Sequence, residues 1–295
     1  MRFTYSVSNV QDHLSPATGM GAVTLRVGNL DKMVDFYRDA VTLDVLSQDG
    51  ELAVLGRGGN PVVLLMHAPE LRAAEPRQAG LYHTAILFES EAALAATVYS
   101  MAQRAPGSFT GSADHLVSKA FYFNDPEGNG IELYWDRDRT EWSWAHGQIE
   151  MATLYLDPNE FLTKHLTEQL IADPRSGGAS VGHVHLSVGD VDTAREFYVD
   201  RLGFETTTMF GSQALFVSAG GYHHHMAMNV WESKGAGRRT LALGLGQVEI
   251  VVPSLDEVAA VNERLTHFGM QTRDDGQSVT VNDPWDNQVK ITVAA

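Results

Sequence analysis

Short stretches of alternating apolar and polar residues, separated by stretches with helical periodicity, run along the whole chain. Residues 22–29 alternate as a strand does, and residues 30–41 carry apolar side chains at the spacing of an amphipathic helix. Three more strands are predicted at 44–48, 51–59 and 60–69, each bounded by turn residues. The first part of the chain is therefore expected to form a β-α-β-β-β unit.

The same order of elements occurs three more times. The second unit has a strand at 80–90, a helix at 91–105 and a hairpin at 115–135. The third and fourth units begin with strands at 183–191 and 241–254, and each continues through one helix into further strands. The expected fold class is therefore α+β, with four βαβββ modules.

Two short motifs give this repeat a period. FYRD, which begins at Phe36, returns as FYVD at Phe197, a shift of 197 − 36 = 161 positions. NDPEGN, which begins at Asn124, returns as NDPWDN at Asn282, a shift of 282 − 124 = 158 positions. Two copies of a two-module half explain both shifts. The boundaries predicted from them are an N-terminal arm at 1–20, a two-module domain at 21–136, a linker at 137–180 and a second two-module domain at 181–295.

The linker is expected to contain a helix. Asp157 is a good N-cap, Pro158 suits the first helical position and Glu160 suits the third. We expect the helix to continue through residues 161–171 and to bridge the two halves.

The hairpin at 115–135 carries an unusual carboxylate. Glu132 lies between Ile131 and Leu133 in an otherwise apolar strand, and alternation puts it on the opposite face from both. That face of the strand is either exposed to solvent or part of a functional site. If Glu132 points inward it needs a cation, because burying an unpaired carboxylate costs several kcal/mol.

Composition narrows the function classes. The formal charge is 21 − 37 = −16, which argues against nucleic acid and anionic membranes as partners. The chain has no cysteine, which excludes disulfides and thiolate chemistry. No apolar run approaches the roughly 18 residues of a membrane span, and no signal-peptide pattern is present, so a cytoplasmic location is expected. No glycine-rich run has nucleotide-binding spacing.

The four modules, the FYxD motif and the DPEGNGIELYWDR run resemble the vicinal oxygen chelate superfamily. This superfamily includes glyoxalase I, bleomycin-resistance proteins and type I extradiol dioxygenases. The run from Asp114 to Trp142 and the GGYHHH run resemble more narrowly the catechol 2,3-dioxygenases of the CatE type. The resemblance covers the chain from Gly21 onward. It implies a metal held in a cup that two modules form together.

The resemblance implies ligand positions on the first and last strand of each module. The first-strand positions fall on Ala22, His83, His183 and Gln247, and the last-strand positions on Val63, Glu132, His225 and Lys290. Modules one and four therefore lack metal ligands, whereas modules two and three supply a complete set. We expect module two to pair with module three and module one with module four. The alternative is two separate, inactive remnants.

The implied activity is extradiol cleavage of a catechol-type aromatic diol by O2, with Fe(II) held by His83, His183 and Glu132. Mn(II), Co(II), Zn(II) and Ni(II) suit the same donors. His225 is assigned acid–base work, although a one-residue bulge would present His224 in its place. Tyr122 and His115 match substrate-side residues of extradiol enzymes, with a packed core tyrosine and an exposed loop histidine as the alternatives.

Two other functions remain open at this point. One is a glyoxalase-like isomerase or lyase in which His225 is a fourth ligand, although glyoxalases usually supply two carboxylates. The other is a non-catalytic protein that binds a small molecule such as an antibiotic. His185 is expected to line the cup or support a ligand, and His67, His146 and His165 are expected at the surface or in the linker. A homo-oligomer is compatible with the sequence, which does not determine the oligomeric state.

Overall fold

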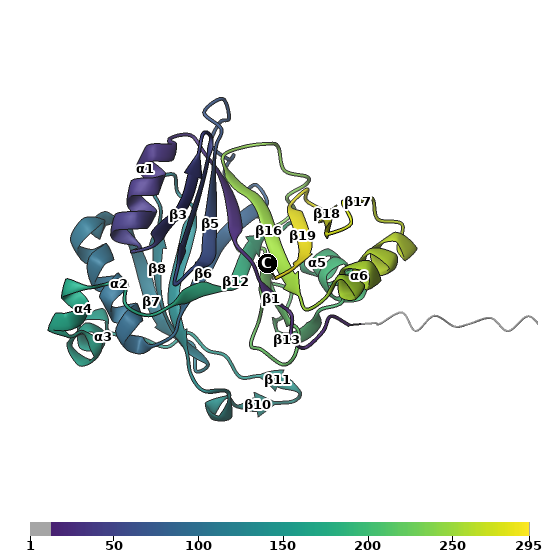
Figure 1. The fold of residues 1–295 in the computed structure, drawn as a ribbon. Helices are drawn as coiled ribbons and strands as arrows, with labels where there is room; N and C mark the ends of the chain where they lie inside the picture. Colours follow the sequence, from purple (N-terminus) through teal and green to yellow (C-terminus); the bar gives the residue numbers. More distant parts are fainter. Residues whose placement is uncertain (1–12, 295) are drawn as a thin grey trace, which may run out of the picture.

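The computed structural model describes residues 13–294, and two curved β-sheets form most of it (Figure 1). The first twelve residues of the expected N-terminal arm lie outside the described part. One sheet has eight strands, in the order β13-β14-β15-β12-β6-β9-β8-β7. The other has nine, in the order β17-β18-β19-β16-β2-β5-β4-β3, with β1 (Gly19–Met20) paired to β16.

The four predicted modules are present, and each contributes four strands and one α-helix. The first contains β2 (Val23–Val27), α1 (Leu30–Asp35), β3 (Asp44–Asp49), β4 (Leu52–Arg57) and β5 (Asn60–His67). The second contains β6 (Gly80–Phe88), α2 (Glu91–Arg104), β7 (Phe109–Asp114), β8 (Ser118–Asn124) and β9 (Gly130–Asp136). The third contains β12 (Ala179–Ser187), α5 (Val191–Arg195), β13 (Glu205–Phe210), β14 (Ala214–Ser218) and β15 (Met226–Asn229). The fourth contains β16 (Gly244–Val252), α6 (Leu255–His267), β17 (Thr272–Asp274), β18 (Ser278–Asn282) and β19 (Gln288–Val293).

The modules pair across the two halves of the chain. Strand β6 of module two runs antiparallel to β12 of module three, and β2 of module one runs antiparallel to β16 of module four. This is the predicted pairing of modules, and it makes each sheet a half-barrel. Helices α2 and α5 pack on the eight-stranded sheet and α1 and α6 on the nine-stranded sheet. No helix within residues 13–294 combines the length and the apolar character needed to cross a membrane.

The two repeated motifs meet in space. The hydroxyl of Tyr37, in FYRD, donates to Asp125 of NDPEGN at 3.2 Å. The hydroxyl of Tyr198, in FYVD, donates to Asp283 of NDPWDN at 3.0 Å. Each contact ties the helix of one module to the last turn of the next module in the chain. The motifs therefore recur because they hold neighbouring modules together.

The helix predicted at 30–41 is not regular to its end. After α1 the chain continues as the π-helical segment η1 (Phe36–Ala40), in which Val41 N–H donates to the carbonyl of Phe36 at 3.2 Å. The same change follows α5, at η4 (Glu196–Arg201). A π-turn widens the helix by one residue, and here it accompanies the tyrosine contact in both halves.

The linker contains two short helices where one was predicted. Asp157 caps α3 (Pro158–His165) by accepting from the N–H groups of Asn159 and Glu160, as predicted. The chain then leaves the helical conformation, and Thr167 caps a second helix, α4 (Glu168–Ala172). The threonine side chain satisfies the backbone of a new helix start, which is why residues 161–171 are not continuous. A small hairpin, β10 (Trp144–Ala145) with β11 (Gln148–Ile149), precedes α3, and two 3-10 turns occur at Pro106–Ser108 and Arg139–Glu141.

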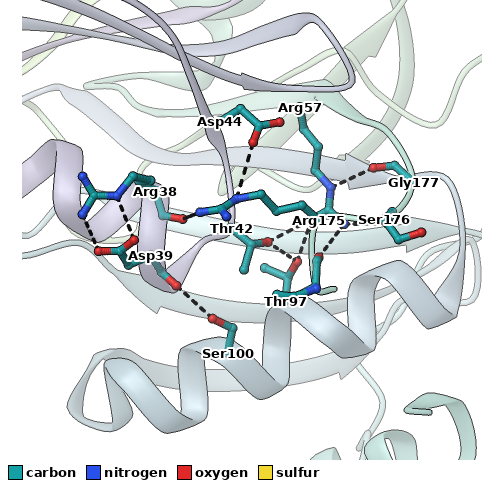
Figure 2. A network of polar contacts seen from close by, with 11 residues as sticks. Arg38, Asp39, Thr42, Asp44, Arg57, Thr97, Ser100, Arg175, Ser176 and Gly177 are labelled. Carbon is teal, nitrogen blue, oxygen red and sulfur yellow. Dashed lines mark hydrogen bonds and ion pairs between the residues drawn. The ribbon is translucent and has the colours of Figure 1, made fainter. Parts of the chain in front are cut away.

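A fully buried arginine fastens the end of the linker (Figure 2). Arg57, at the end of β4, donates from Nε and Nη2 to three backbone carbonyls of residues 174–177, at 2.7–2.8 Å. Its Nη1 donates to the hydroxyls of Thr42 and Thr97 at 2.9 Å. All five donor hydrogens therefore have partners. Because β12 begins at Ala179, this contact fixes the point where the chain enters the third module.

Candidate metal centre

A cavity of about 860 Å³ opens on the concave face of the eight-stranded sheet. Of the six predicted site residues, five line it: His83, His115, Tyr122, Glu132 and His183. They come from modules two and three. The volume lies in the upper part of the range for small-molecule sites.

Strand register brings the three predicted metal ligands together. In the parallel pair of β6 and β9, Glu132 lies opposite Ala85, and in the antiparallel pair of β6 and β12, His183 also lies opposite Ala85. His83 is two residues before Ala85 and therefore on the same face. The methyl group of Ala85 leaves the space between the three larger side chains open.

Their donor atoms converge on one point. Nε2 of His83 lies 2.9 Å from Oε2 of Glu132, and Nε2 of His183 lies 3.1 Å from the same oxygen. One ligand atom from each residue lies within 4.8 Å of the other two. All three side chains are buried, with exposed fractions of 6%, 3% and 2% for His83, Glu132 and His183.

The protonation of this cluster suits a cation. Burial lowers the pKa of His183 to about 4, and the nearby Glu132 offsets this only in part. Burial alone would raise the pKa of Glu132, but His183 and His83 hold it well below its ordinary value. At neutral pH His183 is therefore a neutral imidazole and Glu132 an ionised carboxylate, and His83 lies beside them. Neutral imidazole and ionised carboxylate are the forms that bind metals.

A metal also accounts for an atom without a hydrogen-bond partner. Nε2 of His83 is buried and has no hydrogen bond within the described residues, although it faces the carboxylate of Glu132. A nitrogen lone pair and a carboxylate oxygen repel each other at this distance unless a proton or cation lies between them. Two imidazoles and one carboxylate are the donor set of non-haem Fe(II) sites with open positions. The residues present therefore fit a divalent metal.

His115 and Tyr122 form a pair beside this cluster. The carbonyl of Ala152 accepts a hydrogen bond from His115 Nδ1 at 2.7 Å, so the hydrogen is on Nδ1. Nε2 of His115 lies 2.7 Å from the hydroxyl of Tyr122 and accepts its hydrogen. Burial and the charge of Glu132 raise the pKa of Tyr122 well above its ordinary value, so the phenol stays protonated. The linker, through Ala152, thus orients a predicted substrate-side histidine.

The structure places His224, and not His225, at the cavity. His224 is among the lining residues, and the centroid of its ring lies 4.0 Å from that of His183. The ring of His225 lies 6.2 Å from Phe204, and its Nδ1 accepts from the N–H of Ala219 at 3.2 Å. The expectation that His225 faces the cup is therefore wrong. Strand β15 begins only at Met226, so strand alternation does not extend back to the three histidines.

Register also corrects the counterparts of Glu132 in two other modules. In module two, Glu132 lies opposite Ala85, two residues after His83. In module three, the residue opposite His185, two residues after His183, is Ala227, so the counterpart of Glu132 is Ala227 and not His225. In module one it is Leu64, opposite Thr24, and not the adjacent Val63. The alignment by sequence failed because the modules differ in bulges and turn lengths. The cup of modules two and three therefore has one carboxylate at these positions.

The other cup carries no ligand set at the corresponding positions. They are occupied by Ala22, Leu64, Gln247 and Lys290. Lys290 Nζ donates to Glu249 at 3.0 Å, so a lysine ammonium group supplies the positive charge at these positions.

His185, which was expected to line the cup or support a ligand, lines the cavity and accepts a hydrogen bond from Asn229 Nδ2 at 3.0 Å. Two other lining residues, Tyr82 and Trp231, carried no distinct signal in the sequence. They line the cavity next to His185, with ring centroids 5.0 and 5.4 Å from it and 5.4 Å from each other. Alternation would put Tyr82 opposite to His83, but a register shift between the two strands leaves Tyr82 as an extra residue of β6 between Leu81 and His83, and both Tyr82 and His83 reach the cavity.

Comparison with known proteins agrees with this architecture. Residues 19–133 and 180–291 match the model of the Glyoxalase/Bleomycin resistance protein/Dioxygenase superfamily. A curated catechol-2,3-dioxygenase from Bacillus subtilis (strain 168) is 34% identical over 272 residues, which are 90% of this chain and 94% of that protein.

Solved structures share the fold at lower identity. A Bacillus subtilis protein described provisionally as a dioxygenase has a TM-score of 0.64 at 14% identity, covering 95% of this chain and 86% of that one. Glyoxalase I from Zea mays has a TM-score of 0.58 at 16% identity, covering 94% and 92%. Because the family model matches both halves of the chain and the predicted half-barrels are present, this chain belongs to the Glyoxalase/Bleomycin resistance protein/Dioxygenase superfamily.

Proposed function

We propose that this protein is an extradiol ring-cleaving dioxygenase that acts on catechol-type aromatic diols with O2. The observation that carries the proposal is the donor set at the cavity floor, where two imidazoles and a single carboxylate converge. The activity given for the Bacillus subtilis relative supports it. His83, His183 and Glu132 would hold Fe(II), and Mn(II) is the next candidate for the same ligands.

The charge of the site favours a diol over other ligands. A bound divalent ion supplies positive charge and open coordination positions for the two oxygens of the diol. With Glu132 as the one carboxylate, the loaded site carries a formal charge of +1, which a singly ionised diol neutralises. A second carboxylate would remove this match, and the position where one could stand is Ala227. The alanine argues against a glyoxalase-like isomerase.

Side chains around the cavity would orient the substrate and move its protons. Burial holds the pKa of His224 well below its ordinary value, so this imidazole is neutral at pH 7 and able to accept a hydroxyl proton. The oxygen of Tyr122, whose own hydrogen is bound by His115, can accept a hydrogen bond from a substrate hydroxyl. Trp231 and Phe216 supply apolar walls for an aromatic ring. His224 thus takes the acid–base role that was assigned to His225.

Anaerobic reconstitution tests this function. The full-length chain is loaded with Fe(II), mixed with catechol and then exposed to O2, and a yellow ring-fission product is followed by absorbance. We expect turnover with Fe(II), and none with Zn(II) or Ni(II). Failure with a series of catechols, together with turnover of a hemithioacetal, would replace the dioxygenase by an isomerase. Stoichiometric binding of an aromatic ligand without any turnover would indicate a binding protein.

Metal content of variants tests the site. His83→Ala and His183→Ala should each lower the affinity for iron by more than the roughly 10–100-fold that loss of an outer-shell partner costs, because each removes one of three protein ligands. His67→Ala is the matched control, since the side chain of His67 pairs with Glu51 near the surface, on a strand of the other sheet. Retention of stoichiometric iron in either ligand variant would contradict the site.

A further inference from the structure

A row of hydrogen bonds leads from the cavity toward the surface through residues that do not line it. Nδ1 of His224 lies 2.7 Å from Nδ1 of His223. Nε2 of His223 lies 2.9 Å from Oδ1 of Asp136, and the other oxygen of Asp136 accepts from the hydroxyl of Tyr222 at 2.7 Å. Of these four residues only His224 is part of the cavity wall.

The carboxylate sets the direction of the hydrogen bonds. An ionised carboxylate can only accept, so His223 must carry a hydrogen on Nε2. His223 is fully buried, and a net charge on a ring without access to water is costly. In the neutral ring the other nitrogen, Nδ1, has a lone pair and accepts the hydrogen of His224 Nδ1. A neutral His224 whose hydrogen is on Nδ1 has its lone pair on Nε2.

We propose that Asp136 and His223 are positioning residues that fix the tautomer and orientation of His224, so that Nε2 of His224 presents a lone pair to the cavity. The inference rests on the proposed function for its consequence, because that lone pair is what accepts a hydroxyl proton of a bound diol. The hydrogen-bond row itself is a property of this chain whatever the substrate.

Packing holds the row in place. The ring of Tyr222 lies on that of His223, with centroids 4.1 Å apart, and Trp142 of the linker lies 5.4 Å from it on centroids. Trp142 Nε1 donates to the carbonyl of Arg137, one residue after Asp136. The linker therefore covers the row and fixes the end of β9 that carries its carboxylate.

This arrangement explains three consecutive histidines. His224 faces the cavity and His223 orients it. His225 turns to the other side and accepts the N–H of Ala219. The irregular backbone before β15 lets the three rings point in different directions, which a strand would not allow.

Removing the carboxylate should change the tautomer of His224. In Asp136→Ala, Nε2 of His223 loses its acceptor, and His223 is free to carry its hydrogen on Nδ1 and donate to His224. Nε2 of His224 would then carry a hydrogen and could not accept a second one without becoming charged. We expect kcat with Fe(II) and catechol to fall about 10²-fold, the size of a general-base contribution, with KM little changed. In serine proteases an Asp→Asn change that leaves the geometry intact but sets the wrong histidine tautomer has a larger effect, about 10⁴-fold in kcat.

Nitrogen-15 NMR of histidine-labelled full-length protein without metal reads the tautomer directly. Ring nitrogens with and without a hydrogen differ strongly in chemical shift, and His224→Gln assigns the signal. We expect a bare Nε2 in the wild type, a protonated or mixed Nε2 in Asp136→Ala, and return of the wild-type signal in Asp136→Glu. Asp138→Ala is the matched control, because that carboxylate caps a surface turn through Thr140.

The outcomes separate this inference from the proposed function. A hydrogen on Nε2 of His224 in the wild type would overturn the inference, whether or not the protein cleaves catechols. An unchanged tautomer together with wild-type kcat in Asp136→Ala and in His223→Phe would also overturn it. If no catechol is cleaved but the tautomer responds to Asp136→Ala, the proposed function fails and the positioning role stands.

Discussion

Burial holds four histidines in or near the cavity wall uncharged. The pKa values of His183, His185, His224 and His225 all lie below the ordinary value, and burial is the largest cause for each. An uncharged imidazole can accept a proton or bind a metal, so this serves the site. It also couples stability to pH, because the unfolded chain binds protons that the folded chain does not.

His225 offers a clean measure of that coupling, because it does not line the cavity. Its folded pKa is about 3, against an unfolded value of 6.5. The titration of His225 therefore does not affect stability above pH 6.5, and it lowers the free energy of unfolding as the pH falls from 6.5 toward 3. Between pH 8 and pH 5 the loss amounts to roughly 2 kcal/mol. His225→Asn keeps an acceptor for Ala219 and should remove this part of the pH dependence.

The measurement is urea denaturation of metal-free protein at pH 8 and pH 5. The difference between the two pH values should shrink in His225→Asn and stay unchanged in His267→Asn, an exposed control. An equal pH dependence in the wild type and His225→Asn would show that His225 titrates normally.

At the scale of elements, the junction of β4 with the end of the linker depends on one side chain. Burial lowers the pKa of Arg57 to about 10, and no carboxylate within residues 13–294 hydrogen-bonds to it; its partners are three carbonyls and two hydroxyls. The three carbonyls lose these donors when the guanidinium is removed, whereas the two hydroxyls still bond to each other at 2.9 Å. Arg57 therefore holds residues 174–177 in place at the cost of burying a charge.

Arg57→Met should lower the free energy of unfolding by about 3 kcal/mol, because several buried acceptors lose their partner at once. Equilibrium urea unfolding with a far-UV circular dichroism signal measures this. Arg238→Met is the control, since the side chain of Arg238 is 78% exposed. A loss below about 0.5 kcal/mol, the scale of ordinary surface substitutions, would show that water or a shifted loop replaces Arg57 without cost.

The tyrosine contacts between neighbouring modules allow a matched test in one molecule. Tyr37→Phe and Tyr198→Phe each remove one hydrogen bond to a buried aspartate that keeps its three other donors. Each should lower the free energy of unfolding by about 1.5–3 kcal/mol, as expected for a buried hydrogen bond to a charged group. Thermal unfolding of both variants, with the exposed Tyr155→Phe as control, gives the comparison. A large cost in one and none in the other would mean that the two halves are not held in the same way.

At the scale of the whole molecule, the two halves are linked in two directions. The sheets join module two to module three and module one to module four. The tyrosine contacts join module one to two and three to four. A half of the chain therefore cannot complete either half-barrel by itself, and the candidate metal site needs residues from both.

This interlocking predicts one cooperative unfolding transition. Tryptophan fluorescence reports on Trp135 and Trp142 near the linker and on Trp231 and Trp285 in the second half, whereas circular dichroism reports on the backbone throughout. The two signals should give coincident urea curves for the metal-free chain. Two separated transitions would mean that the halves fold independently in spite of their shared sheets.

Much of the architecture followed from the sequence. Strand and helix periods are local properties, and the repeated FYxD and NDPxxN motifs made the four modules visible. The distribution of ligand types predicted the pairing of modules, since only modules two and three carry histidine and glutamate at the expected positions. His83, Glu132 and His183 lie in the central parts of long strands, and alternation with respect to Ala85 decides the direction of their side chains, although register shifts lie beside His83 and His183.

The tertiary structure alone decided what lies outside regular strands. His224 takes the place at the cavity, and His225 does not, because β15 starts after them and contacts with Asp136, Tyr222 and the linker set the ring directions. The counterparts of Glu132 in modules one and three shift by one and two positions because bulges change the register. Sequence determines which groups are available and which face of a regular strand they share, whereas register, bulges and irregular segments are set by long-range contacts that no local pattern encodes.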